Sequence, residues 1–290
     1  MRARAIAIGA IVLLMMVWGT TYIVTKIAIR EVPPLTLAGL RFLVTALVLL
    51  PFAIAAGGLK RLPRPIPFGT LTLMALTGFV IYYAGFNFAL EYGSASQGAL
   101  IQALLPAAIA LAAVIGLKEK LTKRRIAGIV LAVCGVTLIV AVGKSDSESP
   151  NPLLGGLFML TSVVVWAVYT AQVKHLADCE PTVLLTVIAA IATVIQVPLV
   201  VLELARHPGP LAITAQGWAS VVFLGAIASG IGLLVYNRAL RVLDASLVGT
   251  YINLVPIIGV LSAVALLGET LEGWQIVGAV LALAGMWLAS

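Results

Sequence analysis

Apolar runs of about 20 residues follow one another along this 290-residue sequence, and short polar segments such as "GGLKRLPRP" and "KSDSESPN" separate them. A helix needs about 20 mostly apolar residues to cross the hydrocarbon core of a bilayer. The pattern therefore predicts an all-α integral membrane protein with ten transmembrane helices. The predicted helices cover residues 5–25, 34–56, 68–90, 95–117, 125–143, 152–173, 181–203, 217–237, 245–267 and 273–289.

The composition excludes several other classes of protein. Only 10% of the residues are charged, whereas a soluble domain carries about a quarter. The net charge of +7 does not indicate a nucleic-acid partner, because the basic residues lie in short clusters between apolar runs. Cys134 and Cys179 show no metal-ligand spacing, and the sequence lacks the phosphate-binding pattern GxxxxGKS/T. We expect no metal, no cofactor and no ATP-driven step.

Basic residues are distributed unequally between the two ends of the predicted helices. Cytoplasmic segments of membrane proteins are enriched in Lys and Arg. With a cytoplasmic N-terminus, three basic residues (Arg30, Lys144 and Arg206) face the opposite side, and thirteen are cytoplasmic. The thirteen are Arg2, Arg4, Lys60, Arg61, Arg64, Lys118, Lys120, Lys123, Arg124, Arg125, Lys174, Arg238 and Arg241. This asymmetry predicts that both termini are cytoplasmic.

The two halves of the chain repeat each other. A shift of 148 residues aligns Trp18 with Trp166. Farther along the shift becomes 150, and "NFALEYGSASQGALIQALLP" from Asn87 aligns with "NRALRVLDASLVGTYINLVP" from Asn237. Each half holds five predicted helices, so the second half must enter the membrane inverted, as in many secondary transporters. The predicted units are residues 1–143 as the first half, 144–151 as a linker and 152–290 as the inverted second half.

The duplicated pattern AL-x4-AS-x9-P-x12-E-x-L, with "WGTTYIVTKIAI" and "PPLTLAGLRF", resembles the EamA-type branch of the drug/metabolite transporter superfamily. The resemblance covers essentially the whole chain. It implies a ten-helix carrier in the bacterial inner membrane, with a central cavity lined mainly by helices 1, 3, 4, 6, 8 and 9. Members export amino acids, other metabolites or drugs. The aromatic amino acid exporters are the most similar in length and cavity aromatics.

Several aromatic residues occur within the predicted spans. Tryptophan in membrane proteins usually lies at the membrane interface, so the mid-span pair Trp18 and Trp166 is unusual. Such residues either pack helices together or line a cavity that stacks on a flat or cationic substrate. The residues expected to contact substrate are Trp18, Tyr22, Tyr82, Tyr83, Trp166, Tyr169 and Tyr236.

Neutral polar residues and prolines complete the predicted site. Gln102 and Asn253 lie at membrane depth, where such groups face the bundle interior. Asn87 either contacts substrate or forms an interhelical hydrogen bond. Pro106 and Pro256 each remove a helical hydrogen bond, which produces either a static kink or a bend that gates the carrier.

Charged residues near the spans receive mostly structural interpretations. Arg41 lies within a predicted span, where a central arginine costs about 2.5–3.5 kcal/mol on insertion scales. We expect it to reach outward or to pair with Glu31, and recognition of a substrate carboxylate is the alternative. Lys26 is expected at the membrane interface. Glu119 and Glu269 are expected to stabilise helix starts.

Small residues recur at helical spacing in the last predicted helix of each half. This spacing predicts a seam of close helix packing. The residues are Gly128, Ala132 and Gly135, and their counterparts Gly278, Ala282 and Gly285.

Together these features predict a secondary transporter that exports small metabolites, mainly aromatic and other neutral amino acids, by alternating access. Its partners are a small-molecule substrate and the lipid bilayer, and we expect a monomer or a weak dimer. No span centre contains Asp, Glu or His, so proton coupling would use a peripheral Glu31, Glu91 or Glu203, or be absent. The alternatives are an exporter of cationic drugs, a nucleotide-sugar carrier and a membrane-embedded enzyme.

Overall fold

The computed structural model describes residues 2–63, 65–109, 111, 122–141, 149–173, 176, 179–207, 209–240, 243 and 251–289. Throughout this part of the chain the fold is helical and no β-strand occurs. Within the described residues, seven helices are long and apolar enough to cross a membrane, and three shorter apolar helices accompany them. The chain is therefore a multi-pass membrane protein. Helices suit the bilayer because they satisfy their backbone hydrogen bonds internally within lipid.

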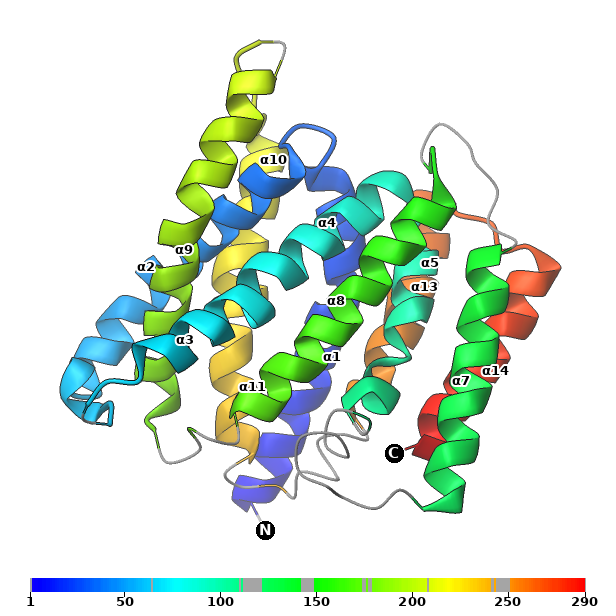
Figure 1. The fold of residues 1–290 in the computed structure, drawn as a ribbon, viewed down its shortest axis with the longest axis horizontal. Coiled ribbons are helices and arrows are strands. Elements are labelled where there is room, and N and C mark those ends of the chain that lie inside the picture. The colour runs from blue at the N-terminus through cyan, green and yellow to red at the C-terminus, as the bar shows by residue number, and fades with distance from the viewer. Residues whose placement is uncertain are drawn as a thin grey trace.

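The helices follow one another along the chain (Figure 1). Their order is α1 (Arg2–Ala28), α2 (Pro34–Ala55), η1 (Gly58–Arg61), α3 (Phe68–Ala75), η2 (Leu76–Ile81), α4 (Tyr82–Tyr92), α5 (Ala95–Gln102), α7 (Lys123–Ala141), α8 (Pro152–Val173), α9 (Pro181–Arg206), α10 (Ala215–Val222), η4 (Phe223–Ile231), α11 (Gly232–Leu240), α13 (Leu254–Leu267) and α14 (Gly273–Ala289). Each predicted span contains at least one of these helices. The spans predicted over 95–117 and 245–267 extend into residues outside the described part.

Prolines and hydroxyl side chains begin several helices. Pro34 and Pro181 stand at the first positions of α2 and α9, where the missing N–H has no helical partner to lose. The side chains of Ser94 and Thr214 cap α5 and α10 by accepting a hydrogen bond from the backbone N–H three residues on. Local sequence therefore sets these starts.

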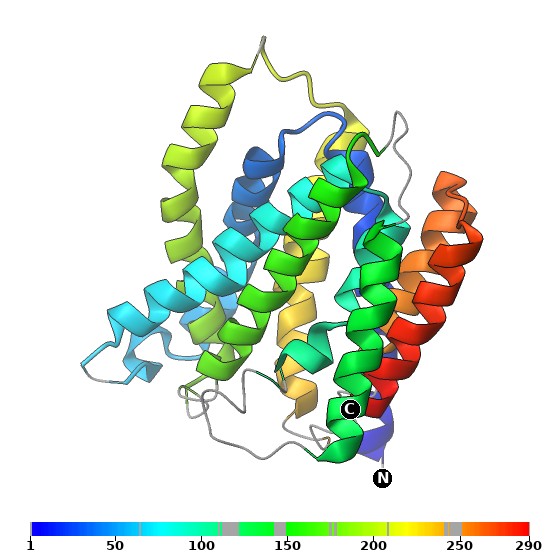
Figure 2. The same cartoon turned by 45° about the vertical axis from the view of Figure 1, so that its right-hand side comes forward.

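Helices from opposite ends of the sequence lie side by side (Figures 1 and 2). The closely packed pairs are α7 with α14, α2 with α9, α4 with α8 and α1 with α13. Under the predicted repeat, α1 with α13 corresponds to α8 with α5, and α4 with α8 corresponds to α1 with α11. Both corresponding pairs are also in contact. This pairing supports the inverted repeat, which stays a prediction.

The predicted seam of small residues is confirmed between α7 and α14. A Cβ added to Gly135 would lie 2.5 Å from the backbone of both Gly278 and Ala282, and one added to Gly278 would lie 2.8 Å from the Gly135 carbonyl. A Cβ added to Gly285 would overlap the backbone of Ala132. Only glycine permits so close an approach of two helix backbones.

Two π-helical segments interrupt the long helices that contain them. The segment η2 (Leu76–Ile81) joins α3 to α4, and η4 (Phe223–Ile231) joins α10 to α11. A shift of 150 residues places η2 on residues 226–231, inside η4. A π-turn changes the hydrogen-bond pattern of the backbone and frequently marks a functional site.

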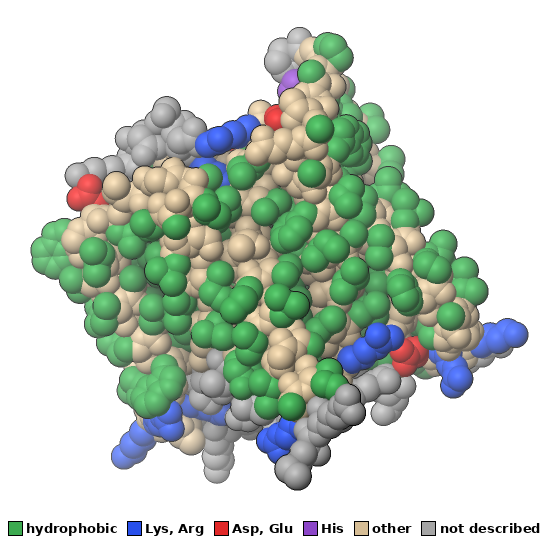
Figure 3. Space-filling view, turned by 180° about the vertical axis from the view of Figure 1, so that it is seen from behind, with side chains coloured by type: hydrophobic (Ala, Val, Ile, Leu, Met, Phe, Trp, Pro, Cys, Tyr) green, Lys and Arg blue, Asp and Glu red, His purple; other side chains and the backbone are tan. Residues whose placement is uncertain are grey.

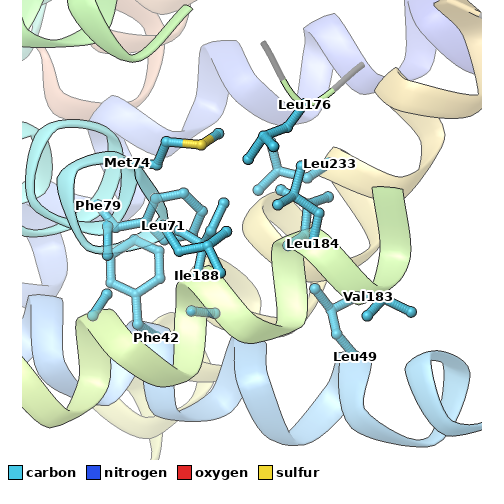
Figure 4. Close-up of a cluster of buried hydrophobic side chains, with 14 of the residues drawn as sticks. Phe42, Leu49, Leu71, Met74, Phe79, Leu176, Val183, Leu184, Ile188 and Leu233 are labelled. Carbon is cyan, nitrogen blue, oxygen red and sulfur yellow. The ribbon is translucent and has the colours of Figure 1, made fainter. Parts of the chain in front are cut away.

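The largest cluster of buried apolar side chains joins α2, α3, α9 and α11 (Figure 4). Phe42 and Leu49 come from α2, Leu71 from α3, Ile188 from α9 and Leu233 from α11. Figure 4 shows these side chains directed toward one another. Lipid tails are as apolar as these side chains and give no hydrophobic driving force between helices. Helix association in the membrane therefore depends on close packing of this kind.

The outer surface has the distribution expected for a membrane protein. Figure 3 shows hydrophobic side chains across the middle of one face, whereas most Lys and Arg side chains on that face lie along its lower border. Both termini lie toward the same lower end of the bundle in Figure 1. An apolar band between charged borders fits the hydrocarbon core of a bilayer.

Candidate functional site

Aromatic side chains from α2, α4 and α8 form a continuous row inside the bundle. The ring centroids of Phe42 and Tyr83 are 4.9 Å apart, and those of Tyr83 and Tyr82 are 4.6 Å apart. Trp166 lies 4.6 Å from Tyr82, and Tyr169 lies 5.1 Å from Trp166. Such tilted and edge-on contacts are favourable. The structure therefore brings four predicted residues together, and it adds Phe42, which resembled an ordinary core residue in the sequence.

Trp18 adjoins this row from α1. Its indole Nε1 donates a hydrogen bond to the carbonyl of Ala228 in η4 at 2.9 Å, and its ring lies 5.5 Å from that of Tyr236. Trp18, Tyr83 and Trp166 are all partly buried against the cluster of Figure 4. The two predicted tryptophans thus border one core, although Trp18 is anchored by a backbone hydrogen bond.

Tyr22 lies apart from Trp18, although the two residues are about one helical turn apart in α1. It is fully buried, with its ring 5.1 Å from Phe86. A Cβ added to Gly259 would lie 3.1 Å from the Tyr22 ring. Tyr22 therefore fills the space between α1, α4 and α13, whereas Trp18 packs against η4 and α11.

The two predicted amides Gln102 and Asn253 each have an acceptor atom without a partner in the described chain. Gln102 Nε2 donates to the hydroxyl of Tyr82 at 2.6 Å. Its Oε1 is buried and has no hydrogen-bond partner among the described residues, and the same holds for Asn253 Oδ1. An unpartnered buried oxygen is costly, so both amides are prepared to accept a hydrogen bond from a ligand or water.

Both helices that contain the predicted gating prolines are interrupted. Helix α5 gives way to a turn at Ala103 and Leu104, just before Pro106, and a turn at Asn253 precedes Pro256. The N–H of Leu104 bonds the carbonyl three residues earlier at 3.0 Å, as in a tighter helix. The breaks lie beside the two unpartnered amides, so the prolines shape the site. Their role in gating stays a prediction.

Asn87 forms a hydrogen bond between two helices. It is 1% exposed, and its Nδ2 donates to the carbonyl of Pro34 at the start of α2 at 2.8 Å. This is the structural alternative predicted for Asn87. The side chain of its repeat partner Asn237 lies outside the described part of the structure.

The expected pairing of Arg41 with Glu31 is wrong. Both oxygens of Glu31 accept hydrogen bonds from Thr214, which starts α10. Arg41 is instead buried, with Nε donating to the hydroxyl of Ser229 at 2.8 Å and its guanidinium carbon 4.1 Å from the centroid of the Tyr83 ring. Glu31 does not pair with Arg41 because its carboxylate binds the start of a helix in the other half of the chain.

Lys26 is buried between helices, and its position at the membrane interface stays a prediction. Lys26 is 4% exposed, and its ammonium donates to the carbonyls of Leu90 and Gly93, both at 2.7 Å. These carbonyls end α4, where a cation is favourable because it complements the helix dipole. Leu90 and Gly93 lie more than 60 residues from Lys26, so the sequence carried no local signal for this contact.

Carboxylates also start helices that are distant in sequence. Glu269 accepts from the backbone N–H groups of Ala95 and Ser96 at 2.8 and 2.9 Å, and thus caps α5. Glu203 accepts from Leu35 and Thr36 at the start of α2. The predicted helix-start role is confirmed for Glu269, although on α5 and not on the following helix. Its repeat partner Glu119 lies outside the described residues.

Sequence comparison gives one consistent match. The profile of the EamA-like transporter family matches residues 5–141 and again residues 153–290. An uncharacterized transporter of Archaeoglobus fulgidus is 26% identical and is aligned over 96% of this chain and 95% of its own. A probable amino-acid metabolite efflux pump of Salmonella typhimurium is 28% identical over 95% of this chain and 92% of its own.

Structural comparison gives a match to the fold. A crystal structure with 22% sequence identity covers 100% of this chain and 96% of the matched chain, with a TM-score of 0.65. A likeness of this extent shows that the two chains share an overall fold.

Proposed function

Because the chain belongs to the EamA-like transporter family, we propose that it exports neutral amino acids, chiefly those with aromatic side chains, across the inner membrane. Both the family and the similar proteins indicate a transporter and not an enzyme. The site supports the amino-acid class, and so does the similarity to the Salmonella protein described as a probable amino-acid metabolite efflux pump.

The observation that carries this proposal is the row of rings together with an amide, Gln102, that bonds one of these rings and keeps an unpartnered oxygen. Tyr82, Tyr83 and Trp166 offer flat apolar surfaces to an aromatic or aliphatic side chain. Gln102 and Asn253 offer oxygens that lack partners in the described chain, and an ammonium group would donate to them. Mostly apolar walls with a few placed polar groups are typical of small-molecule sites.

The transport mechanism that we propose is alternating access between residues 1–143 and an inverted second half, 152–290. Three features support it: corresponding helix pairs are in contact, the two π-segments overlap after the 150-residue shift, and both proline helices break at corresponding turns. Inverted halves give two equivalent gates around one site. The breaks beside Pro106 and Pro256 are the bends at which each gate moves.

We propose that export is driven by the substrate's own gradient. Glu31 and Glu203 are held by backbone N–H groups at helix starts, so neither is placed to carry a proton through the site. Glu91, at the end of α4, is the remaining peripheral carboxylate. Its Oε2 is buried without a partner in the described chain, and it lies outside the aromatic row.

The test is uptake of radiolabelled phenylalanine or tryptophan into proteoliposomes that contain the purified protein. Competition with amino acids, amines and sugars would define the substrate class, and the assay would be run with and without a pH gradient. We expect saturable uptake that amino acids inhibit and that the gradient does not change. Uptake inhibited only by amines or by sugars would contradict the amino-acid proposal, and dependence on the gradient would contradict uncoupled transport.

A further inference from the structure

Arg41 is an unusual residue for the middle of α2. It is 3% exposed and lies within the Pro34–Ala55 span. Charged side chains at membrane depth are costly and commonly mark substrate or ion pathways. The contacts of Arg41 therefore have to explain how this charge is compensated.

The described residues leave the Arg41 charge without a counter-ion. Its Nε bonds the neutral hydroxyl of Ser229, and its guanidinium stacks on the Tyr83 ring. Nη1 is buried and has no hydrogen-bond partner within the described chain. No carboxylate of the described chain forms an ion pair with Arg41, since Glu31 and Glu203 are both engaged at helix starts. A buried guanidinium without an anionic partner has a desolvation cost that no ion pair offsets.

The contact between α2 and η4 does not depend on the Arg41 side chain alone. The Thr45 hydroxyl lies within hydrogen-bond distance of two carbonyls, that of Arg41 at 2.8 Å and that of Gly225 at 2.9 Å. A Cβ added to Gly225 would lie 2.7 Å from the Arg41 carbonyl, so the backbones of the two elements pack closely. The guanidinium adds one hydrogen bond to this contact, from Nε to Ser229.

The neighbours of Arg41 connect it to the candidate site. Tyr83, which it covers, is in ring contact with Tyr82. Tyr82 contacts Trp166 and accepts the hydrogen bond from Gln102. A cationic donor thus lies against Tyr83, and an acceptor without a partner in the described chain, Gln102 Oε1, belongs to the amide that bonds the neighbouring Tyr82.

The geometry points to Arg41 as the group that binds the substrate's carboxylate, with Gln102 Oε1 as an acceptor for its ammonium. Guanidinium suits this task because its planar donors match a carboxylate. The substrate class is then an α-amino acid whose side chain lies along the tyrosines and Trp166. This inference rests on the proposed function, and it places the carboxylate at a residue for which the sequence favoured a structural role.

The first experiment tests ligand chemistry on the unmodified protein. Equilibrium binding of radiolabelled phenylalanine to the purified protein would be competed with 3-phenylpropionate, which lacks the ammonium, and with phenethylamine, which lacks the carboxylate. We expect phenethylamine to compete at least about tenfold more weakly than phenylalanine, since a charge-assisted hydrogen bond is lost. Equal competition by phenethylamine and phenylalanine would overturn the inference without any variant.

The second experiment assigns the preference to Arg41. Arg41→Gln should weaken the binding of phenylalanine and 3-phenylpropionate at least about tenfold. The binding of phenethylamine should not change, so the preference for a carboxylate disappears. Gln102→Met should weaken the binding of phenylalanine and phenethylamine but not that of 3-phenylpropionate. The matched control is Arg61→Gln, which removes one exposed positive charge outside the row.

The outcomes separate this inference from the proposed function. If phenylalanine binds and Arg41→Gln keeps the carboxylate preference, the Arg41 assignment falls and amino-acid export stands. If 3-phenylpropionate binds through Arg41 while amino acids do not, the amino-acid proposal falls and the carboxylate anchor stands. Loss of all three ligands together in Arg41→Gln, with unchanged elution on size exclusion, would show a general role and contradict the assignment.

Discussion

Trp166 links two other rings of the candidate site. Its ring touches both Tyr82 and Tyr169, so Trp166→Ala interrupts the aromatic row between them. We expect this variant to insert into the membrane normally and to lose at least about tenfold in transport, the equivalent of 1.4 kcal/mol of binding. Uptake into proteoliposomes, normalised to inserted protein, would measure the loss.

The matched control for this variant is Trp274→Ala, because Trp274 is 65% exposed at the start of α14. We expect the control to transport at the wild-type rate. Wild-type transport by Trp166→Ala would remove Trp166 from the site.

The contacts of Lys26 lead to a prediction about the stability of the protein. Its ammonium satisfies two carbonyls at the end of α4, and Lys26→Met would leave both without that donor. We expect a cost of at least about 1.5 kcal/mol, because hydrogen bonds to charged groups contribute this much or more. Thermal unfolding in detergent should show a lower Tm than for Lys60→Met, which alters an exposed lysine. Equal Tm values for the two variants would contradict the buried role.

Among the elements, α7 and α14 make the closest backbone contact. Gly285→Val would place side-chain atoms against the backbone of Ala132 and Gly128. Overpacking costs about 1–3 kcal/mol where neighbours can shift, and backbone can shift little, so we expect the upper end of this range. Size-exclusion yield and Tm would measure it. Gly9→Val is the control, since a Cβ at Gly9 meets nothing within 4 Å; a similar loss in both variants would argue against a specific seam.

The interrupted helix that contains Pro256 leads to a kinetic prediction. Pro256→Ala restores an N–H and favours continuous helix across the turn at Asn253. We expect slower transport with little change in ligand affinity, because the bend and not the binding surface is altered. The control is Pro198→Ala, since Pro198 lies inside α9 on the exposed surface. Unchanged turnover in Pro256→Ala would mean that the break is static.

For the whole molecule, the distribution of Lys and Arg predicts cytoplasmic termini. The test uses single cysteines in a background without Cys134 and Cys179, labelled in intact cells by a membrane-impermeant maleimide. We expect Gly209→Cys, in the loop after α9, to be labelled, and Lys60→Cys, in η1, to be labelled only after permeabilisation. The reverse pattern would invert the assigned orientation.

Much of the fold could be predicted from the sequence, because span length and apolarity are local properties. Helix starts at Pro34 and Pro181 and the seam around Gly135 also followed from local patterns. The hydrogen bonds of Lys26 and Arg41 could not be predicted, since their hydrogen-bond partners lie 64 to 188 residues away. The site was partly predictable: aromatic residues within spans were identifiable, but their pairing depends on how α2, α4 and α8 pack.

The seam between α7 and α14 also has a consequence for how the chain is made. Gly135 is synthesised about 150 residues before Gly285, so α7 enters the membrane long before its partner exists. Until the ribosome releases residues 273–289, the glycine face of α7 has only lipid or provisional neighbours against it. The contact therefore forms only after α14 has been inserted, and a chain that stops before α14 leaves the glycine face of α7 without this partner.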